Sequence, residues 1–157
     1  MKNILIIGGG SIGKRHLRNL MTLGEKNIAV VEPNAERARA EIEEPHGLRT
    51  FRSLKDALAA QTFDIVFVCS PSIFHMEQAL TSAEKGCDLF IEKPLSHSLD
   101  NVRQLIAIAE EKKLISMVGC NWKFYPLFQK MKELLDSGAI GKVLSARCQF
   151  GQYLPDW

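Results

Sequence analysis

The stretch Ile4-Leu5-Ile6-Ile7-Gly8-Gly9-Gly10-Ser11-Ile12-Gly13 decides the fold of this chain. A short aliphatic strand runs directly into a glycine-rich turn, and a pattern of helical period follows it. Read as G-x-G-x-x-G, the glycines allow one register: Gly8, Gly10 and Gly13. The first glycine permits a sharp turn, the second a close approach of pyrophosphate to the backbone, and the third close packing of helix on strand. The stretch therefore predicts a dinucleotide-binding half.

The phosphate site is expected at the start of the helix that follows the glycines. Free backbone N–H groups and the helix dipole favour an anion there, which adds Ser11 and Ile12 to the candidate contacts. The start of this helix is basic, with Lys14, Arg15, His16 and Arg18; the alternatives for this charge are long-range attraction of cofactor phosphates and an ordinary solvated face.

The second half of the fingerprint is a carboxylate at the end of the next strand. Residues 27–31 form an apolar run that ends at Glu32, 19 positions after Gly13. This is close to the spacing of about 20 at which an acid binds the adenosine ribose diol. A carboxylate accepts hydrogen bonds from a free 2′-hydroxyl and repels a 2′-phosphate, so NAD is predicted over NADP. The alternative is a structural glycine turn, with Glu32 an ordinary strand-end residue.

Size and composition are those of an ordinary globular protein. The chain has 157 residues, 46% of them hydrophobic, and a net charge of +2, which gives no reason to expect a nucleic acid or a membrane surface as partner. No apolar run approaches a membrane span and no signal peptide precedes the first strand, so a cytoplasmic location is expected. The four cysteines form no metal-binding pattern, and we expect them to be structural. No metal site is predicted.

Strands alternate with helices along most of the chain. Each strand is a near-continuous aliphatic run, which indicates a parallel sheet covered on both faces, an α/β doubly wound fold of the Rossmann type. Six strands are expected, at residues 2–7, 27–31, 50–51, 64–68, 88–91 and 114–118. Helices are expected at 11–23, at 33–44, at 54–60 capped by Ser53, after residue 72, and after a cap at Ser98. The predicted inner faces of the last two include Ile73, Met76, Leu80, Ala83, Val102, Leu105, Ile106 and Ala109.

The pattern changes after residue 121. A helix is expected from Pro126, with Phe128, Met131, Leu134 and Leu135 inward, and then a strand of alternating character over residues 142–150. The predicted domains are 1–121, which binds the dinucleotide, and 122–157, a junction helix and the first strand of a second domain.

Five motifs, in this order, resemble the glucose–fructose oxidoreductase / inositol dehydrogenase / MocA family. They are the glycine fingerprint, Ser70-Pro71 followed by His75, Glu92-Lys93-Pro94, residues 119–126 (GCNWKFYP) and residues 137–143 (SGAIGKV). The resemblance implies an NAD(P)-dependent oxidoreductase acting on a sugar, nucleotide sugar or cyclic polyol. It also implies a second, α+β domain that carries most of the substrate pocket and the usual catalytic histidine, and that mediates homo-oligomerisation.

None of the four histidines here has the D-x-x-x-H context of that catalytic histidine. By resemblance, the chain is an isolated N-terminal domain that binds cofactor and is inactive alone. Two alternatives are a stand-alone dinucleotide-sensing module and an enzyme completed by pairing its last strand with a second chain.

The resemblance also assigns roles to residues at the ends of later strands. Lys93 is the candidate catalytic residue, because an ammonium group beside the nicotinamide can hydrogen-bond the reacting oxygen. The remaining cofactor contacts, beside Lys93 itself, are Ser70, Pro71, His75, Glu92 and Asn121. For His75, packing at a helix start is the alternative; for Glu92, orientation of Lys93 is. Lys123 stands where the family often has arginine, which weakens any bidentate anchoring of substrate there.

Overall fold

Six parallel strands form one sheet, in the order β3-β2-β1-β4-β5-β6. The structure is a computed structural model that describes residues 2–151, and it divides into two compact units, residues 1–120 and 121–157. The strands are β1 (Ile4–Ile7), β2 (Ile28–Val31), β3 (Arg49–Phe51), β4 (Ile65–Val68), β5 (Asp88–Ile91) and β6 (Ser116–Val118). The predicted α/β doubly wound fold is confirmed.

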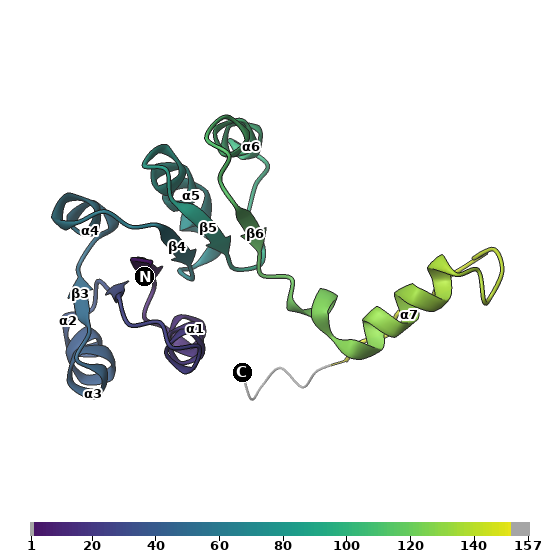
Figure 1. Cartoon of the computed structure of the whole chain (residues 1–157), viewed down its shortest axis with the longest axis horizontal. Helices are drawn as coiled ribbons and strands as arrows, with labels where there is room; N and C mark the ends of the chain where they lie inside the picture. The colour runs from purple at the N-terminus through teal and green to yellow at the C-terminus, as the bar shows by residue number, and fades with distance from the viewer. Residues whose placement is uncertain (1, 152–157) are drawn as a thin grey trace. The chain divides into compact units, whose positions relative to one another are not determined.

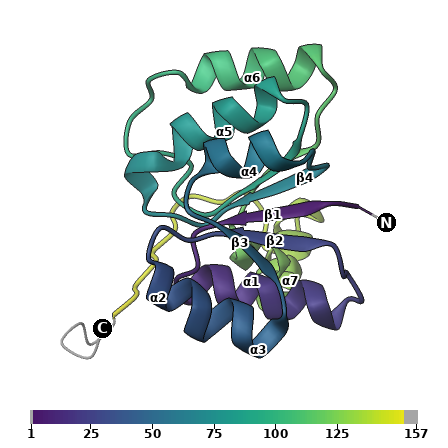
Figure 2. The same ribbon diagram turned by 90° about the vertical axis from the view of Figure 1, so that its left-hand side faces the viewer.

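Helices cover both faces of the sheet in the first unit (Figures 1 and 2). One face carries α1 (Ser11–Thr22), α2 (Ala35–Ala38), the π-helical turn η1 (Arg39–Glu43) and α3 (Glu44–His46). The other carries α4 (Leu54–Ala60), the 3-10 turn η2 (Ser72–Phe74), α5 (His75–Glu84) and α6 (Val102–Glu111). This is the two-sided cover that uninterrupted aliphatic strands require.

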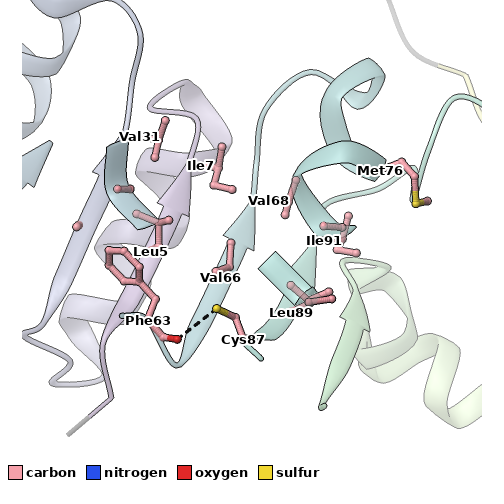
Figure 3. Close-up of a cluster of buried hydrophobic side chains, with 14 of the residues drawn as sticks. Leu5, Ile7, Val31, Phe63, Val66, Val68, Met76, Cys87, Leu89 and Ile91 are labelled. Carbon is pink, nitrogen blue, oxygen red and sulfur yellow. Dashed lines mark hydrogen bonds between the residues drawn. The ribbon is translucent and has the colours of Figure 1, made fainter. Parts of the chain in front are cut away.

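Alternate residues of β1 supply the two cores. Ile4 and Ile6 pack with Leu17 of α1 and Ile42 of η1 on one face, while the cluster that includes Leu5 occupies the other. Figure 3 shows this second cluster, in which the Cys87 thiol donates to the Phe63 carbonyl oxygen at 3.2 Å. All four residues of β1 are at most 2% exposed, so β1 is the centre of the fold.

The sheet order reverses between β1 and β4, both of which pair with parallel neighbours in register. In an open α/β sheet, ligands bind in the crevice beyond the carboxyl ends of the strands at such a switch point. The glycine turn follows β1 and Ser70-Pro71 follows β4, so both motifs lie at this crevice.

Several local predictions are wrong. The single helix expected over residues 33–44 is interrupted by η1, which precedes Pro45, a residue with no N–H to donate to the preceding turn. Ser98 is not a helix cap: its Oγ accepts from the Asp100 N–H in a local turn, and α6 begins after Asn101, whose φ is 61°. Ser53 does cap α4, accepting from the Asp56 N–H.

Two residues expected in the core are exposed. Ile73 lies in η2, before α5 begins, and is 60% exposed; Ile106 lies on α6 and is 51% exposed, while Leu105 is buried. Apolar spacing alone placed both inward, but the short 3-10 turn changes the phase at Ile73, and α6 turns Leu105 to the sheet instead of Ile106.

The second unit contains the 3-10 turn η3 (Asn121–Phe124) and α7 (Pro126–Asp136). The Trp122 ring stacks on Phe128 at 5.3 Å between centroids, and Phe150 meets Trp122 edge-on at 5.6 Å. The side chains predicted to face inward on α7 are 37–51% exposed. Residues 142–150 were expected to form a strand, but they have no regular secondary structure, because no segment of residues 2–151 pairs with them.

Candidate functional site

The glycine turn is shaped by close backbone contacts. Gly8 has a φ of 103°, and a Cβ there would lie 2.9 Å from the carbonyl carbon and oxygen of Cys69. A Cβ at Gly13 would lie 1.8 Å from the Gly8 carbonyl oxygen. At Gly10 a Cβ would meet no atom within 4 Å. Gly8 and Gly13 therefore let the chain pack on itself, while Gly10 borders open space, as a pyrophosphate site requires.

The N-terminus of α1 faces the same space. Its N-cap, Gly10, has no side chain with which to satisfy the first N–H groups of the helix, and no acidic residue lies in the first turn. These donors, at Ser11, Ile12 and Gly13, suit an anion. Lys14 is paired with Glu41 of η1, so its charge is partly neutralised within the protein.

Glu32 is a buried carboxylate at the end of β2. It is 5% exposed, and it accepts hydrogen bonds from the Gly9 N–H to Oε2 at 3.1 Å and from the Asn34 N–H to Oε1 at 2.9 Å. The Arg37 guanidinium lies 3.5 Å from Oε2. Because each carboxylate oxygen has a further lone pair, Glu32 can still accept from a ligand hydroxyl.

Gly9 is a site residue that the fingerprint does not single out. A Cβ there would lie 2.8 Å from both Glu32 Oε2 and the Cδ1 of Ile42, a residue that is fully buried. The first x of the G-x-G-x-x-G motif is therefore a glycine for a steric reason: without a side chain there, the Glu32 carboxylate has room beside the loop. Its only sequence signal was the run of three glycines.

A groove of about 760 Å³ joins these elements. It contains the predicted residues Gly8, Gly10, Ser11, Ile12, Glu32, Ser70 and Pro71. Three cations also line it: Arg37, which the sequence places near Glu32, and Arg52 and Lys55, which sequence reasoning did not assign to the site. We call the part of the groove around Glu32 and Arg37 the Glu32 end.

A second hollow of about 290 Å³ lies at the ends of β4 and β5. It is lined by Ile12, Ser70, Ser72, His75, Glu92, Lys93 and Pro94, and we call it the Lys93 end. Ile12 and Ser70 line both spaces. Lys93 is exposed and precedes a cis peptide bond to Pro94.

His75 is buried between two loops. It is 2% exposed; its Nδ1 lies 2.9 Å from the Pro94 carbonyl oxygen and its Nε2 lies 2.7 Å from that of Ser70. Since a neutral imidazole has one N–H, both contacts are hydrogen bonds only when the ring carries two protons. This geometry favours the packing interpretation of His75, because both nitrogens are already used by the protein.

The Glu92 side chain is turned toward α1. Its Oε1 lies 2.7 Å from His16 Nε2, and its Oε2 accepts from the Lys93 N–H at 3.2 Å. A Cβ at Gly119 would lie 3.2 Å from the carboxylate. Sequence reasoning missed His16 as a site residue, because it appeared only as one of several basic residues on its helix.

Cys69 lies below the glycine turn and is 6% exposed. Burial, with a smaller contribution from the Glu92 charge, raises the pKa of its thiol to about 12. The thiol is therefore protonated and unreactive at neutral pH, as a structural cysteine should be. Cys87 is also buried, and its pKa is raised, mainly by burial.

Asn121 begins the second unit and lines neither of the two spaces described above. Its contact with a cofactor stays a prediction. Within residues 2–151, no helix is both long enough and apolar enough to cross a membrane.

Comparison with known proteins agrees with this geometry. A family model described as an oxidoreductase family with an NAD-binding Rossmann fold, GFO_IDH_MocA, matches residues 2–120. The chain belongs to the glucose–fructose oxidoreductase / inositol dehydrogenase / MocA family. This membership confirms the resemblance from the motifs, and it makes the first unit the NAD-binding part of an enzyme family.

Individual relatives point the same way. An uncharacterized oxidoreductase of Bacillus subtilis is 33% identical over 87% of this chain and 40% of its own length, and inositol 2-dehydrogenase of Corynebacterium glutamicum is 30% identical over 90% and 43%. The WlbA dehydrogenase of Bordetella pertussis, solved with NADH and UDP-GlcNAcA, superimposes with a TM-score of 0.81 at 25% identity, covering 88% of this chain and 40% of that one. The chain thus spans about two fifths of the length of these relatives.

Proposed function

We propose that this chain binds NAD along the groove, with the adenosine ribose at Glu32, the pyrophosphate at Gly10 and the start of α1, and the nicotinamide at the Lys93 end. The observation that carries the proposal is the buried carboxylate of Glu32, fixed by two backbone N–H groups beside open space over Gly10. Family membership and the NADH in the WlbA dehydrogenase structure support the same cofactor.

The proposed preference for NAD over NADP follows from charge. Glu32 would accept from a free 2′-hydroxyl and repel a 2′-phosphate. Arg37, Arg52 and Lys55 line the same groove and act in the opposite sense, although Arg37 is partly neutralised by its pairing with Glu32. The preference for NAD therefore depends on Glu32, one carboxylate among three cations. Replacing Glu32 should clearly change the ratio of NAD affinity to NADP affinity.

For the whole protein we propose NAD-dependent oxidation or reduction of a hydroxyl or ketone on a sugar, nucleotide sugar or cyclic polyol. Inositol 2-dehydrogenase among the relatives and UDP-GlcNAcA in the WlbA dehydrogenase structure support this substrate range. The nicotinamide, when bound, would accept the hydride in the oxidation and, as NADH, donate it in the reduction. Lys93, exposed at the mouth of the second hollow, would donate a hydrogen bond to the reacting oxygen. Homo-oligomerisation and a cytoplasmic location stay predictions.

Calorimetric titration of the chain with NAD and NADP tests the cofactor assignment. We expect NAD to bind about tenfold tighter, since one hydrogen bond to a charged group is worth about 1.5–3 kcal/mol. Glu32→Ala should reduce this ratio to about threefold or less, or invert it, because Arg37 loses its partner. Glu36→Ala, which removes an exposed acid from the same segment, should leave the ratio unchanged. Equal or tighter binding of NADP by the unaltered chain would contradict the proposal.

A further inference from the structure

The loop of residues 92–94 is held from two sides by histidines on different helices. His16, on α1, contacts the side chain of the residue before Lys93, and His75, on α5, contacts the carbonyl oxygen of the residue after it. Lys93 itself is exposed between these two fixed points. The backbone that carries the lysine is thus anchored, while its ammonium group remains free to meet a ligand.

The His16 contact is built into the packing of the sheet. Its ring lies edge-on to Phe90 of β5 at 4.9 Å between centroids, and 5.5 Å from Phe67 of β4. Phe67 and Phe90 in turn stack on each other at 4.9 Å. These aromatic contacts hold the imidazole in one place, with Nε2 directed to Glu92.

Glu92 needs this partner. Its side chain is only 13% exposed, and that of His16 is 16% exposed. One carboxylate oxygen accepts from the Lys93 N–H and the other lies 2.7 Å from His16 Nε2, while a Cβ at Gly119, directly after β6, would lie 3.2 Å from the carboxylate. Without the imidazole, a largely buried carboxylate oxygen would lose its protein donor and turn toward solvent or the ligand space.

We propose that His16 is a positioning residue for the Lys93 end: through Glu92 it ties the 92–94 loop to α1, the helix whose N-terminus meets the phosphates. The contact between His16 and Glu92 thus joins α1 to the end of β5 and sets the distance between the pyrophosphate site and Lys93. This inference rests on the proposed NAD site, and it adds a residue and a role that the motifs do not assign. Because Glu92 is turned inward, its own part is to hold Lys93 in position.

ADP-ribose, which lacks the nicotinamide, distinguishes a positioning role of His16 at the Lys93 end from a general effect of His16 on stability. His16→Phe keeps an aromatic ring on Phe67 and Phe90 but removes the N–H. We expect this variant to bind NAD about three- to tenfold more weakly, the effect of losing one charge-assisted hydrogen bond at a partly exposed site, and to bind ADP-ribose unchanged. His16→Gln, which retains an amide donor at similar reach, should recover most of the NAD affinity. Arg18→Gln, on the exposed side of α1, is the matched control.

A second readout does not depend on binding. In the free chain, His16→Phe should shift the backbone amide resonance of Lys93, whereas Arg18→Gln should not. If His16→Phe fails to fold, His16→Leu, which also lacks the N–H, replaces it in both measurements. Equal weakening of NAD and ADP-ribose, or an unmoved Lys93 amide, would overturn the positioning role. Failure of the unaltered chain to bind NAD would instead overturn the proposed function, and the amide shift would still decide the link between His16 and Lys93.

Discussion

At the Glu32 end of the site a carboxylate accepts from two backbone N–H groups, whereas at the Lys93 end a carboxylate accepts from one backbone N–H and is also held by a distant histidine side chain. Glu32 accepts from residues 9 and 34, close to it on neighbouring loops, and the glycines set that backbone. Glu92 accepts from His16, 76 positions away. The first arrangement is rigid and depends on the absence of side chains; the second depends on particular side chains meeting across the sheet. The two ends should therefore respond differently to substitution.

The glycine turn beside the Glu32 end should be most sensitive to an added methyl group. Gly13→Ala places a Cβ 1.8 Å from the Gly8 carbonyl oxygen, a contact with backbone that cannot rotate away. We expect about 3 kcal/mol or more to be lost from the free energy of unfolding. Urea denaturation measures it, with Gly10→Ala as control, since a Cβ at Gly10 meets nothing within 4 Å and should cost less than about 1 kcal/mol. Similar stabilities of the two variants would contradict a rigid glycine turn.

The Lys93 end should be most sensitive to loss of a ring nitrogen. His75→Phe preserves a ring of similar size but removes the ring N–H that the carbonyl oxygen of Ser70 or of Pro94 accepts, or that both accept when the ring carries two protons. We expect about 2–3 kcal/mol to be lost from the free energy of unfolding. The exposed His97, replaced by Phe in the same way, should change stability by less than about 0.5 kcal/mol. A His75→Phe variant as stable as the original would show that the two carbonyls do not need the imidazole.

Gly9→Ala should separate specificity from affinity at the Glu32 end. The new Cβ, 2.8 Å from Glu32 Oε2 and from Ile42 Cδ1, forces the carboxylate or the isoleucine to move. We expect about 1–3 kcal/mol of destabilisation, and a ratio of NAD to NADP affinity reduced about fivefold. Competitive titration of both dinucleotides checks this. An unchanged ratio in a destabilised protein would mean that the isoleucine moves and Glu32 does not.

The smallest effect on stability at neutral pH is expected at Cys69, a buried residue that lines the groove. Its pKa is raised from 9.0 to about 12 in the folded protein, so between these values the folded state keeps a proton that the unfolded state loses. Its contribution to stability is complete below pH 9 and declines as pH rises above it. Unfolding measured from pH 7 to 10.5 should show a shallower alkaline decline for Cys69→Ala than for the original chain. Parallel declines would contradict the shift.

Much of the Glu32 end could be predicted from the sequence because its determinants are local. Strand, glycines, helix, strand and acid follow one another, and each has a recognisable residue type. The requirement for a glycine at position 9 was missed because it arises partly from the close approach of Ile42. The π-helical turn before Pro45 brings Ile42 over the loop. Apolar periodicity cannot show such a turn.

The Lys93 end was predictable only in part. The motif identified Lys93 and its neighbours, but not the donors that hold them, because His16 and Glu92 meet only once α1 and β5 are placed on the sheet. His75 was recognised by position, yet its contacts with two carbonyl oxygens could not be inferred. The exposure of Ile73 and the start of α6 after Asn101 likewise depend on turns that residue spacing does not determine.

The most direct test of one site with two ends is to map bound NAD on the backbone amide spectrum of the chain. We predict that saturating NAD shifts the resonances of residues 8–13, of Glu32 and Asn34, of Ser70 and of Lys93, while ADP-ribose shifts the first three groups and leaves Lys93 in place. Shifts that spare the glycine turn and Glu32, or a Lys93 resonance that NAD does not move, would contradict the account.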